Sequence, residues 1–179
     1  RDCLLSRGLG DVYKRQYEGK ATQIGDGNFL MDRAHICHDV HIFNQCVIGI
    51  GTCIAGECEI HDCSIQSNGV VVQQHVRVGR FSLIQSGCRV QKDVPPYVIL
   101  GGNPASYHGV NTVVLKQVKV TDRILRHIAN TYRIIYTGNF SLQDAVIKIP
   151  EQIPMSEEIE KILEFIKGAK NGIVRNMEE

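Results

Sequence analysis

The chain has 179 residues, of which 22% are charged, and a formal net charge of +1, so its overall charge does not indicate a nucleic-acid partner. This length suits one domain, or one domain with an appendage. The sequence has no apolar run of membrane-spanning length and no secretory signal, from which we expect a cytoplasmic protein without integral membrane association.

Residues 1–16 lack the repeat that marks the following sequence, and we interpret them as an artefact or a disordered lead. The next segment is in full repeat register from its first visible unit, at Ile24. Because the open end of a repeat fold normally needs a cap, this pattern predicts an amino-terminally truncated chain in which upstream coils are missing.

From Ile24 to Val94 an aliphatic side chain recurs every six residues. This period matches neither an α-helix nor an alternating strand. It is typical of parallel β-helices, in which each hexad forms a short strand and a turn and three hexads close one coil. We therefore predict a mainly β domain over residues 17–111, with about four coils of the β-helix. The repeated positions are Ile24, Leu30, Ile36, Ile42, Ile48, Ile54, Ile60, Gln66, Val72, Val78, Ile84 and Val90.

A second position, four residues after each aliphatic one, carries mostly small side chains that fit where the wall bends. Cys46, Cys58 and Cys88 occupy it, and cysteine acts there as a small apolar residue. The seven cysteines are odd in number and include no C-x-x-C pair, so disulfide frameworks, zinc ribbons and redox dithiols are poorly supported. This usage predicts a reducing compartment.

The repeat ends at residues 93–97, Asp-Val-Pro-Pro-Tyr, because prolines cannot donate hydrogen bonds to a β-ladder. A turn-rich exit follows over residues 101–105. Residues 112–179 are predicted to form a small helical carboxy-terminal domain that packs on the end of the solenoid or on neighbouring subunits. Its predicted helices run from the N-cap Thr121 to Tyr136, from about residue 141, and from about residue 156.

The densest polar cluster contains His35, His38, Asp39 and His41. Three interpretations compete: polar residues that simply line the outer corners, a metal site, or a general base. A metal site needs a second subunit, because His35 and His41 are one hexad apart and lie on successive faces. An imidazole beside a carboxylate can instead take a proton from a hydroxyl near neutral pH.

Residues eighteen apart stack in columns, and the column of His38 favours the general-base interpretation. The next members are Gly56, whose bare N–H can serve as an oxyanion donor, and Gln74, whose amide can bind substrate. The neighbouring column contains Asp39, Glu57 and His75. A base, a bare amide and a side-chain amide along one edge are the parts that acyl transfer requires.

The motifs resemble one known family over about residue 20 to the end. The chain is similar to the acyl-carrier-protein–UDP-N-acetylglucosamine O-acyltransferases of lipid A biosynthesis, particularly those of the Bacteroides group. The motif His-Ile-x-His-Asp, combined with Gly-Val-Asn and the helical tail, is specific, whereas Gly-Asn-Pro-Ala alone is common to many hexapeptide transferases. The resemblance is carried by the hexads and by residues 35–39, 93–97, 102–105, 109–111 and 130–136.

This resemblance implies a left-handed β-helix, a homotrimer and active sites between subunits. It also implies transfer of a (R)-3-hydroxyacyl group from acyl carrier protein to the 3-hydroxyl of UDP-N-acetylglucosamine. No metal and no organic cofactor is implied, because phosphopantetheine arrives on the donor protein.

Carried over by motif position, the resemblance makes His38 the base, Asp39 its orienting partner and Gly56 the oxyanion donor. His35 and Asn111 would contact substrate, and Gln73 and Gln74 occupy the place of a substrate-binding His-Gln pair in enterobacterial members.

The chain departs from those enterobacterial members at other positions. Glu57 replaces a histidine, and Val113 and Gln117 replace acidic and arginine nucleotide contacts, which leaves the nucleotide-side contacts open. The acyl-chain length that the enzyme prefers cannot be predicted from the sequence.

The distribution of basic residues predicts a surface that binds a protein partner. The predicted helical region carries a basic cluster with only Asp122 opposing it, and acyl carrier proteins are strongly acidic, so we expect this cluster to dock the carrier protein. The residues predicted to dock it are Lys116, Lys119, Arg123 and Arg126.

Three other functions compete with the O-acyltransferase. One is the lipid A N-acyltransferase, which shares the solenoid but whose tail is less similar. Another is a metal lyase of the γ-carbonic anhydrase kind, which needs histidines that meet across a subunit boundary. The third is a structural solenoid, which would need neither His38 nor Asp39.

Overall fold

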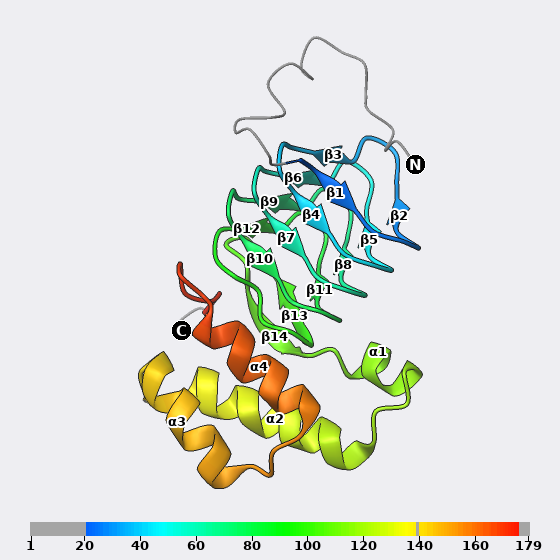
Figure 1. The fold of residues 1–179 in the computed structure, drawn as a ribbon. Helices are drawn as coiled ribbons and strands as arrows, with labels where there is room; N and C mark the ends of the chain where they lie inside the picture. Colours follow the sequence, from blue (N-terminus) through cyan, green and yellow to red (C-terminus); the bar gives the residue numbers. More distant parts are fainter. Residues whose placement is uncertain (1–20, 139, 176–179) are drawn as a thin grey trace.

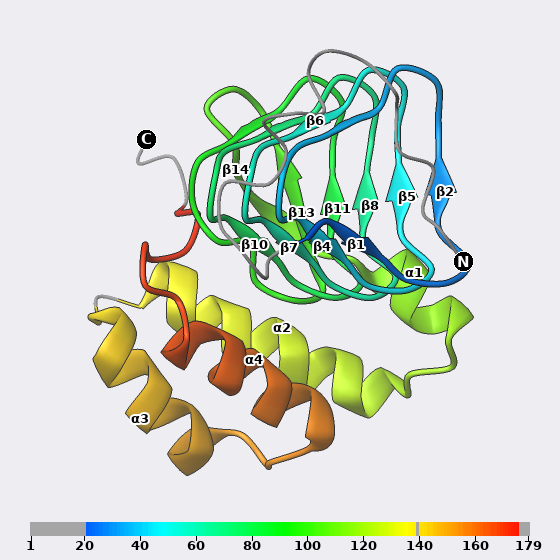
Figure 2. The same cartoon turned by 45° about the horizontal axis from the view of Figure 1, so that its top comes forward.

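The computed structural model describes residues 21–138 and 140–175, and the prediction for residues 1–16 lies outside them. A stack of triangular coils makes up the amino-terminal part, and the helices lie together at one end of this stack (Figure 1). In the turned view the coils lie side by side, with β1, β4, β7 and β10 in one row and β2, β5, β8 and β11 in another (Figure 2).

Twelve two-residue strands form the walls of the coils within the described residues. They belong to three sheets, with strand orders β1-β4-β7-β10, β2-β5-β8-β11 (continued by β13 and β14) and β3-β6-β9-β12. The strands are β1 (Gln23–Ile24), β2 (Phe29–Leu30), β3 (His35–Ile36), β4 (His41–Ile42), β5 (Val47–Ile48), β6 (Cys53–Ile54), β7 (Glu59–Ile60), β8 (Ile65–Gln66), β9 (Val71–Val72), β10 (Arg77–Val78), β11 (Leu83–Ile84) and β12 (Arg89–Val90).

The strand register confirms the predicted repeat. Ile36 pairs with Ile54 and Ile54 with Val72, all in parallel, so partners are eighteen residues apart. The fold is therefore the predicted left-handed parallel β-helix followed by helices. Each coil returns the chain to the same wall, one strand spacing further along the stack.

The corners of the coils recur at the same period and orient the polar residues. Asp39, Glu57 and His75 have φ angles of 57°, 58° and 64°, in the left-handed region that side chains rarely adopt. They occupy one corner on successive coils, so their side chains form one row.

The core is a column of aliphatic side chains inside the prism. From Val40 onward the repeated aliphatic residues and their small companions, including Cys46, Cys58 and Cys88, are almost fully buried. Gln66 stands at one of the repeated aliphatic positions, and it donates to Ser64 Oγ (3.2 Å) within the core. Burial of this apolar column is the main force that holds the coils in register.

The chain leaves the solenoid as a β-hairpin instead of the turn-rich exit alone. β13 (Val98–Gly101) pairs in parallel with β11 and in antiparallel with β14 (Ser106–Val110). The prolines that precede β13 thus interrupt the repeat without ending the sheet. The sequence pattern missed this hairpin because it contains glycine and proline between its strands.

Four helices follow the hairpin in the described part of the chain. α2 begins after the predicted N-cap Thr121, whose side chain accepts from the Ile124 N–H, and the other predicted helices are also present. The short helix α1 was not predicted. None of the helices within the described ranges is long and apolar enough to cross a membrane. The helices are α1 (Thr112–Gln117), α2 (Asp122–Thr137), α3 (Leu142–Gln152) and α4 (Glu157–Lys167).

Arg77 joins the solenoid to these helices. Its guanidinium pairs with the buried Asp93 carboxylate (2.8 Å), donates to the Phe165 carbonyl of α4 (2.9 Å) and lies over the Phe165 ring. The segment after α4 returns to the solenoid, where the Val174 N–H donates to the Asp93 carbonyl (2.9 Å). The last described residues are therefore anchored beside β10.

Candidate active site

His38 and Asp39 lie together in the turn that follows β3. His38 Nδ1 is 3.0 Å from Asp39 Oδ2, and the two side chains are 19% and 2% exposed. An ionised carboxylate can only accept a hydrogen bond, so Nδ1 carries the proton and the Nε2 lone pair remains available. This is the arrangement that a general base requires.

Gly56 lies directly against the His38 ring, as the column arithmetic predicts. A Cβ built on Gly56 would stand 2.4 Å from both Cε1 and Nε2 of His38, closer than real contacts allow. Glycine is needed here for close approach. The Glu57 N–H donates to the His38 carbonyl (3.1 Å) and fixes the two coils relative to each other.

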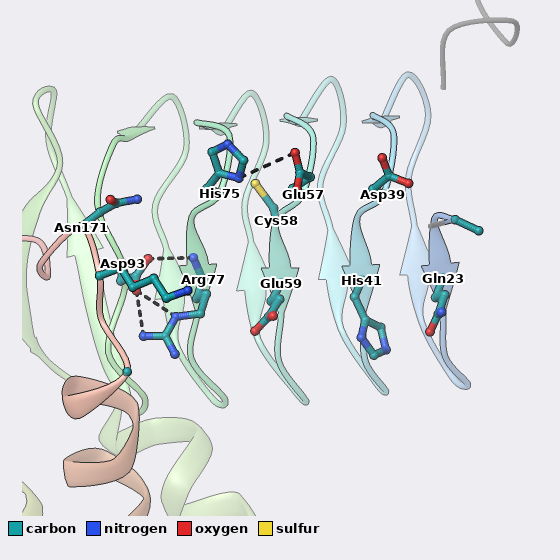
Figure 3. A pocket seen from close by; sticks show the side chains of 13 residues that line it. Gln23, Asp39, His41, Glu57, Cys58, Glu59, His75, Arg77, Asp93 and Asn171 are labelled. Atoms are coloured by element: carbon teal, nitrogen blue, oxygen red, sulfur yellow. Dashed lines mark hydrogen bonds and ion pairs between the residues drawn. The ribbon is translucent and has the colours of Figure 1, made fainter. Parts of the chain in front are cut away.

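The corner row of Asp39, Glu57 and His75 borders a groove of about 700 Å³ (Figure 3). Gln74 Nε2 donates to Glu57 Oε1 (3.4 Å), and His75 Nδ1 lies 3.9 Å from the same oxygen. These three side chains thus form a polar network beside the predicted base. Sequence reasoning placed them in adjacent columns but did not foresee the bond between Glu57 and Gln74.

The outward side chains of β4, β7 and β10 form another wall of the groove. The His61 ring, whose Nε2 lies 3.5 Å from Glu59 Oε2, holds the pKa of the Glu59 carboxyl below its usual range. Lys170 and Asn171, from the returning terminal segment, line it as well. No local sequence signal could have placed these last two, because their position depends on how the helices pack.

The other predicted site residues fall in two environments. His35 is exposed on β3, and Gln73 is exposed just after β9. Asn111 is buried, its side chain donates to the Phe81 carbonyl (2.9 Å) and its N–H to the Tyr97 carbonyl (2.7 Å). It therefore fastens the end of the hairpin, and its predicted contact with substrate stays a prediction.

The predicted docking residues Lys116, Lys119, Arg123 and Arg126 are all exposed, in α1, the following turn and the first turns of α2. Val113 and Val118, which neighbour them in the chain, are exposed as well. This part of the surface therefore combines positive charge with apolar side chains.

Histidines of the cluster do not gather around one point. His35 begins a strand of one sheet and His41 begins a strand of another. Among the described residues, no group of three His, Cys, Asp or Glu side chains is placed to hold a metal ion.

Comparisons with known sequences and with solved structures both find UDP-N-acetylglucosamine acyltransferases. A family model described as UDP N-acetylglucosamine O-acyltransferase, domain 2, matches residues 93–174. A solved UDP-N-acetylglucosamine acyltransferase from Bacteroides fragilis is 42% identical, with a TM-score of 0.81 over 83% of this chain and 58% of that one. The chain is therefore similar to UDP-N-acetylglucosamine O-acyltransferases over more than four fifths of its own length.

Two further acyltransferases match this chain to a similar extent. The Acyl-[acyl-carrier-protein]–UDP-N-acetylglucosamine O-acyltransferase of Pseudomonas aeruginosa is 30% identical over 154 residues, which is 86% of this chain and 60% of that protein. The Francisella novicida UDP-N-acetylglucosamine acyltransferase is 30% identical, with a TM-score of 0.82 over 86% of this chain and 56% of that one. The chain thus spans about 60% of the length of the curated relatives it matches.

Proposed function

We propose that the protein transfers a (R)-3-hydroxyacyl group from acyl carrier protein to the 3-hydroxyl of UDP-N-acetylglucosamine, the first step of lipid A biosynthesis. The names of its relatives support this substrate pair. The observation that carries the proposal is the His38 imidazole, held by Asp39 and packed on the bare backbone of Gly56.

In the proposed reaction His38 Nε2 takes the proton of the attacking sugar hydroxyl. The hydroxyl oxygen bonds to the thioester carbonyl carbon, and the carbonyl π electrons move to its oxygen. Asp39 keeps the imidazole in the tautomer that accepts the proton and stabilises the imidazolium that forms. The Gly56 N–H donates to the negative oxygen of the tetrahedral intermediate.

The intermediate collapses as the carbon–sulfur bond breaks. The proton on His38 passes to the departing phosphopantetheine sulfur, which leaves as the thiol of the carrier protein. Base and acid are thus the same side chain, and the proposed reaction needs no metal or further cofactor. His35, Gln73, Gln74 and Asn111 are the proposed substrate contacts.

We also propose that acyl carrier protein docks on the basic surface formed by Lys116, Lys119, Arg123 and Arg126. The exposed valines beside these residues support this proposal, because a short-lived complex uses charge to orient the partner and apolar contact to hold it. A cytoplasmic location, where the carrier protein is found, belongs to the same proposal.

A homotrimer completes the proposal. The outward residues of β2, β5, β8, β11 and β13 are all apolar, whereas the outward column of the β1-containing sheet is polar. Such an apolar face suits burial against a second copy of the chain. Its outward column consists of Phe29, Val47, Ile65, Leu83 and Ile99.

An assay of the purified chain with UDP-N-acetylglucosamine and a series of 3-hydroxyacyl carrier proteins tests the function. We expect sugar acylation, with His38→Ala lowering kcat by about 10²–10⁴-fold and leaving the unfolding midpoint nearly unchanged. Unaltered turnover in that variant would exclude His38 as the base. Transfer only to an amino-sugar acceptor would instead indicate the N-acyltransferase.

A further inference from the structure

Three backbone N–H groups at one recurring turn position are each capped by an Asn or Asp side chain from the next coil. The Asp26 N–H donates to Asn44 Oδ1 (2.9 Å) and the Asn44 N–H to Asp62 Oδ1 (3.0 Å). The Ile50 N–H donates to Asn68 Oδ1 (3.0 Å) in the same way. In each case donor and acceptor are eighteen residues apart. An Asn or Asp at this position therefore accepts the hydrogen bond of the turn N–H one coil earlier in the chain.

Gly56 occupies the same turn position, six residues after Ile50, and its counterpart one coil further is Gln74. Gln74 does not cap it. Its Nε2 donates to Glu57 Oε1, and the Gly56 N–H has no hydrogen-bond partner among the residues that the structure describes. A carboxylate only accepts, so Glu57 binds the NH₂ end of the amide.

We propose that Glu57 and Gln74 are positioning residues that keep the Gly56 N–H open for the oxygen of the acyl carbonyl. The inference rests on the proposed acyl transfer and extends it to two residues that shape the oxyanion site. Glutamine is one methylene longer than asparagine, and its NH₂ group is held by Glu57. An Asn at this place would cap Gly56 as Asn68 caps Ile50.

The decisive variant is Gln74→Asn, a conservative change that we expect to be the most damaging at this position. The introduced amide oxygen should accept from the Gly56 N–H and remove the oxyanion donor, which lowers kcat by about 10²–10³-fold. Gln74→Ala removes the same substrate contact without supplying a cap, so it should lower kcat less. A crystal structure of Q74N should show the new hydrogen bond to Gly56.

Two further variants separate this role from a general loss of structure. Asn68→Gln uncaps Ile50 on another corner and should leave kcat unchanged. Glu57→Ala frees the Gln74 amide and should lower kcat several-fold in the wild-type background, but not in the Q74A background, where no side chain remains to be positioned.

The outcomes distinguish the two proposals. If Q74N forms the cap and turns over no more slowly than Q74A, the positioning role is wrong while acyl transfer stands. If Q74N forms no cap, the positioning role is also wrong. If the wild-type chain transfers no acyl group, the proposed function is wrong, and the crystal structure still decides whether position 74 can close the turn.

Discussion

At the scale of single residues, the site depends on one absent side chain. Gly56 has an ordinary negative φ, so its backbone does not require glycine, whereas the His38 ring does. Gly51 shows the opposite case. Its φ is +66° and nothing lies within 4 Å of a built Cβ, so glycine is favoured there by backbone conformation and not by lack of space.

These two glycines predict opposite phenotypes. Gly56→Ala places a methyl group against the His38 ring and should lower kcat by about 10²-fold or more, because the base and the oxyanion donor move apart. Gly51→Ala should cost about 1 kcal/mol of stability through backbone strain and keep its turnover. Steady-state kinetics and urea unfolding of both variants check this pair. Equal kinetics for both would contradict the proposed site.

The burial of three cysteines predicts that their thiols do not react in the folded protein. Burial raises the pKa of the Cys58 thiol to about 12 and also raises the pKa of Cys46 and Cys88. The reactive thiolate of Cys58 is therefore scarce at pH 8, and the packed walls exclude reagent from all three. Ellman's reagent, with peptide mapping, should leave these thiols unmodified in the native protein and label them in denaturant.

At the scale of elements, Arg77 is the principal polar link between β10 and α4. Arg77→Met removes the partner of the buried Asp93 carboxylate and should lower the free energy of unfolding by about 3–5 kcal/mol. Denaturant titration measures the loss. Lys161→Met, which breaks the exposed pair with Glu157, is the matched control and should have no measurable effect. Equal stability of R77M and wild type would show that the helices are held by apolar packing alone.

The basic surface is an element-scale feature as well. Reversing both Arg123 and Arg126 to Glu should raise the KM for the acyl carrier substrate several-fold at low salt, with kcat retained. Lys167→Glu, at the end of α4, provides a charge-reversal control outside the docking surface and matches the charge change of the single variant Arg123→Glu. Unchanged KM at low ionic strength would place the carrier protein on a different face.

At the scale of the whole molecule, the apolar wall predicts assembly. Leu83→Glu puts a charge into the apolar outward column, on β11, and it should shift the sedimentation coefficient from that of a trimer to that of a monomer. Glu59→Gln, on the outward column of a polar wall, is the control. A wild-type chain that sediments as a monomer would contradict the proposed trimer.

The sequence pattern predicted the parts of this molecule that follow from a fixed period. Spacing alone was enough to place His38 against Gly56, because residues eighteen apart must share a corner. The hairpin of β13 and β14, the burial of Asn111 and the return of Lys170 to the groove could not be predicted. Each depends on contacts between segments far apart in the chain, and such contacts leave no periodic trace.

The triangular cross-section has a consequence for how such a protein tolerates changes in length. Inserting one hexad between His38 and Gly56 would preserve every inward aliphatic residue, and the coils would still pack. It would also rotate the glycine by one third of a turn, onto a corner that the imidazole does not face. An insertion of six residues would therefore preserve the fold, but only an insertion of a complete coil of eighteen residues would keep His38 and Gly56 on the same corner. A chain with one inserted hexad would be well folded and inactive.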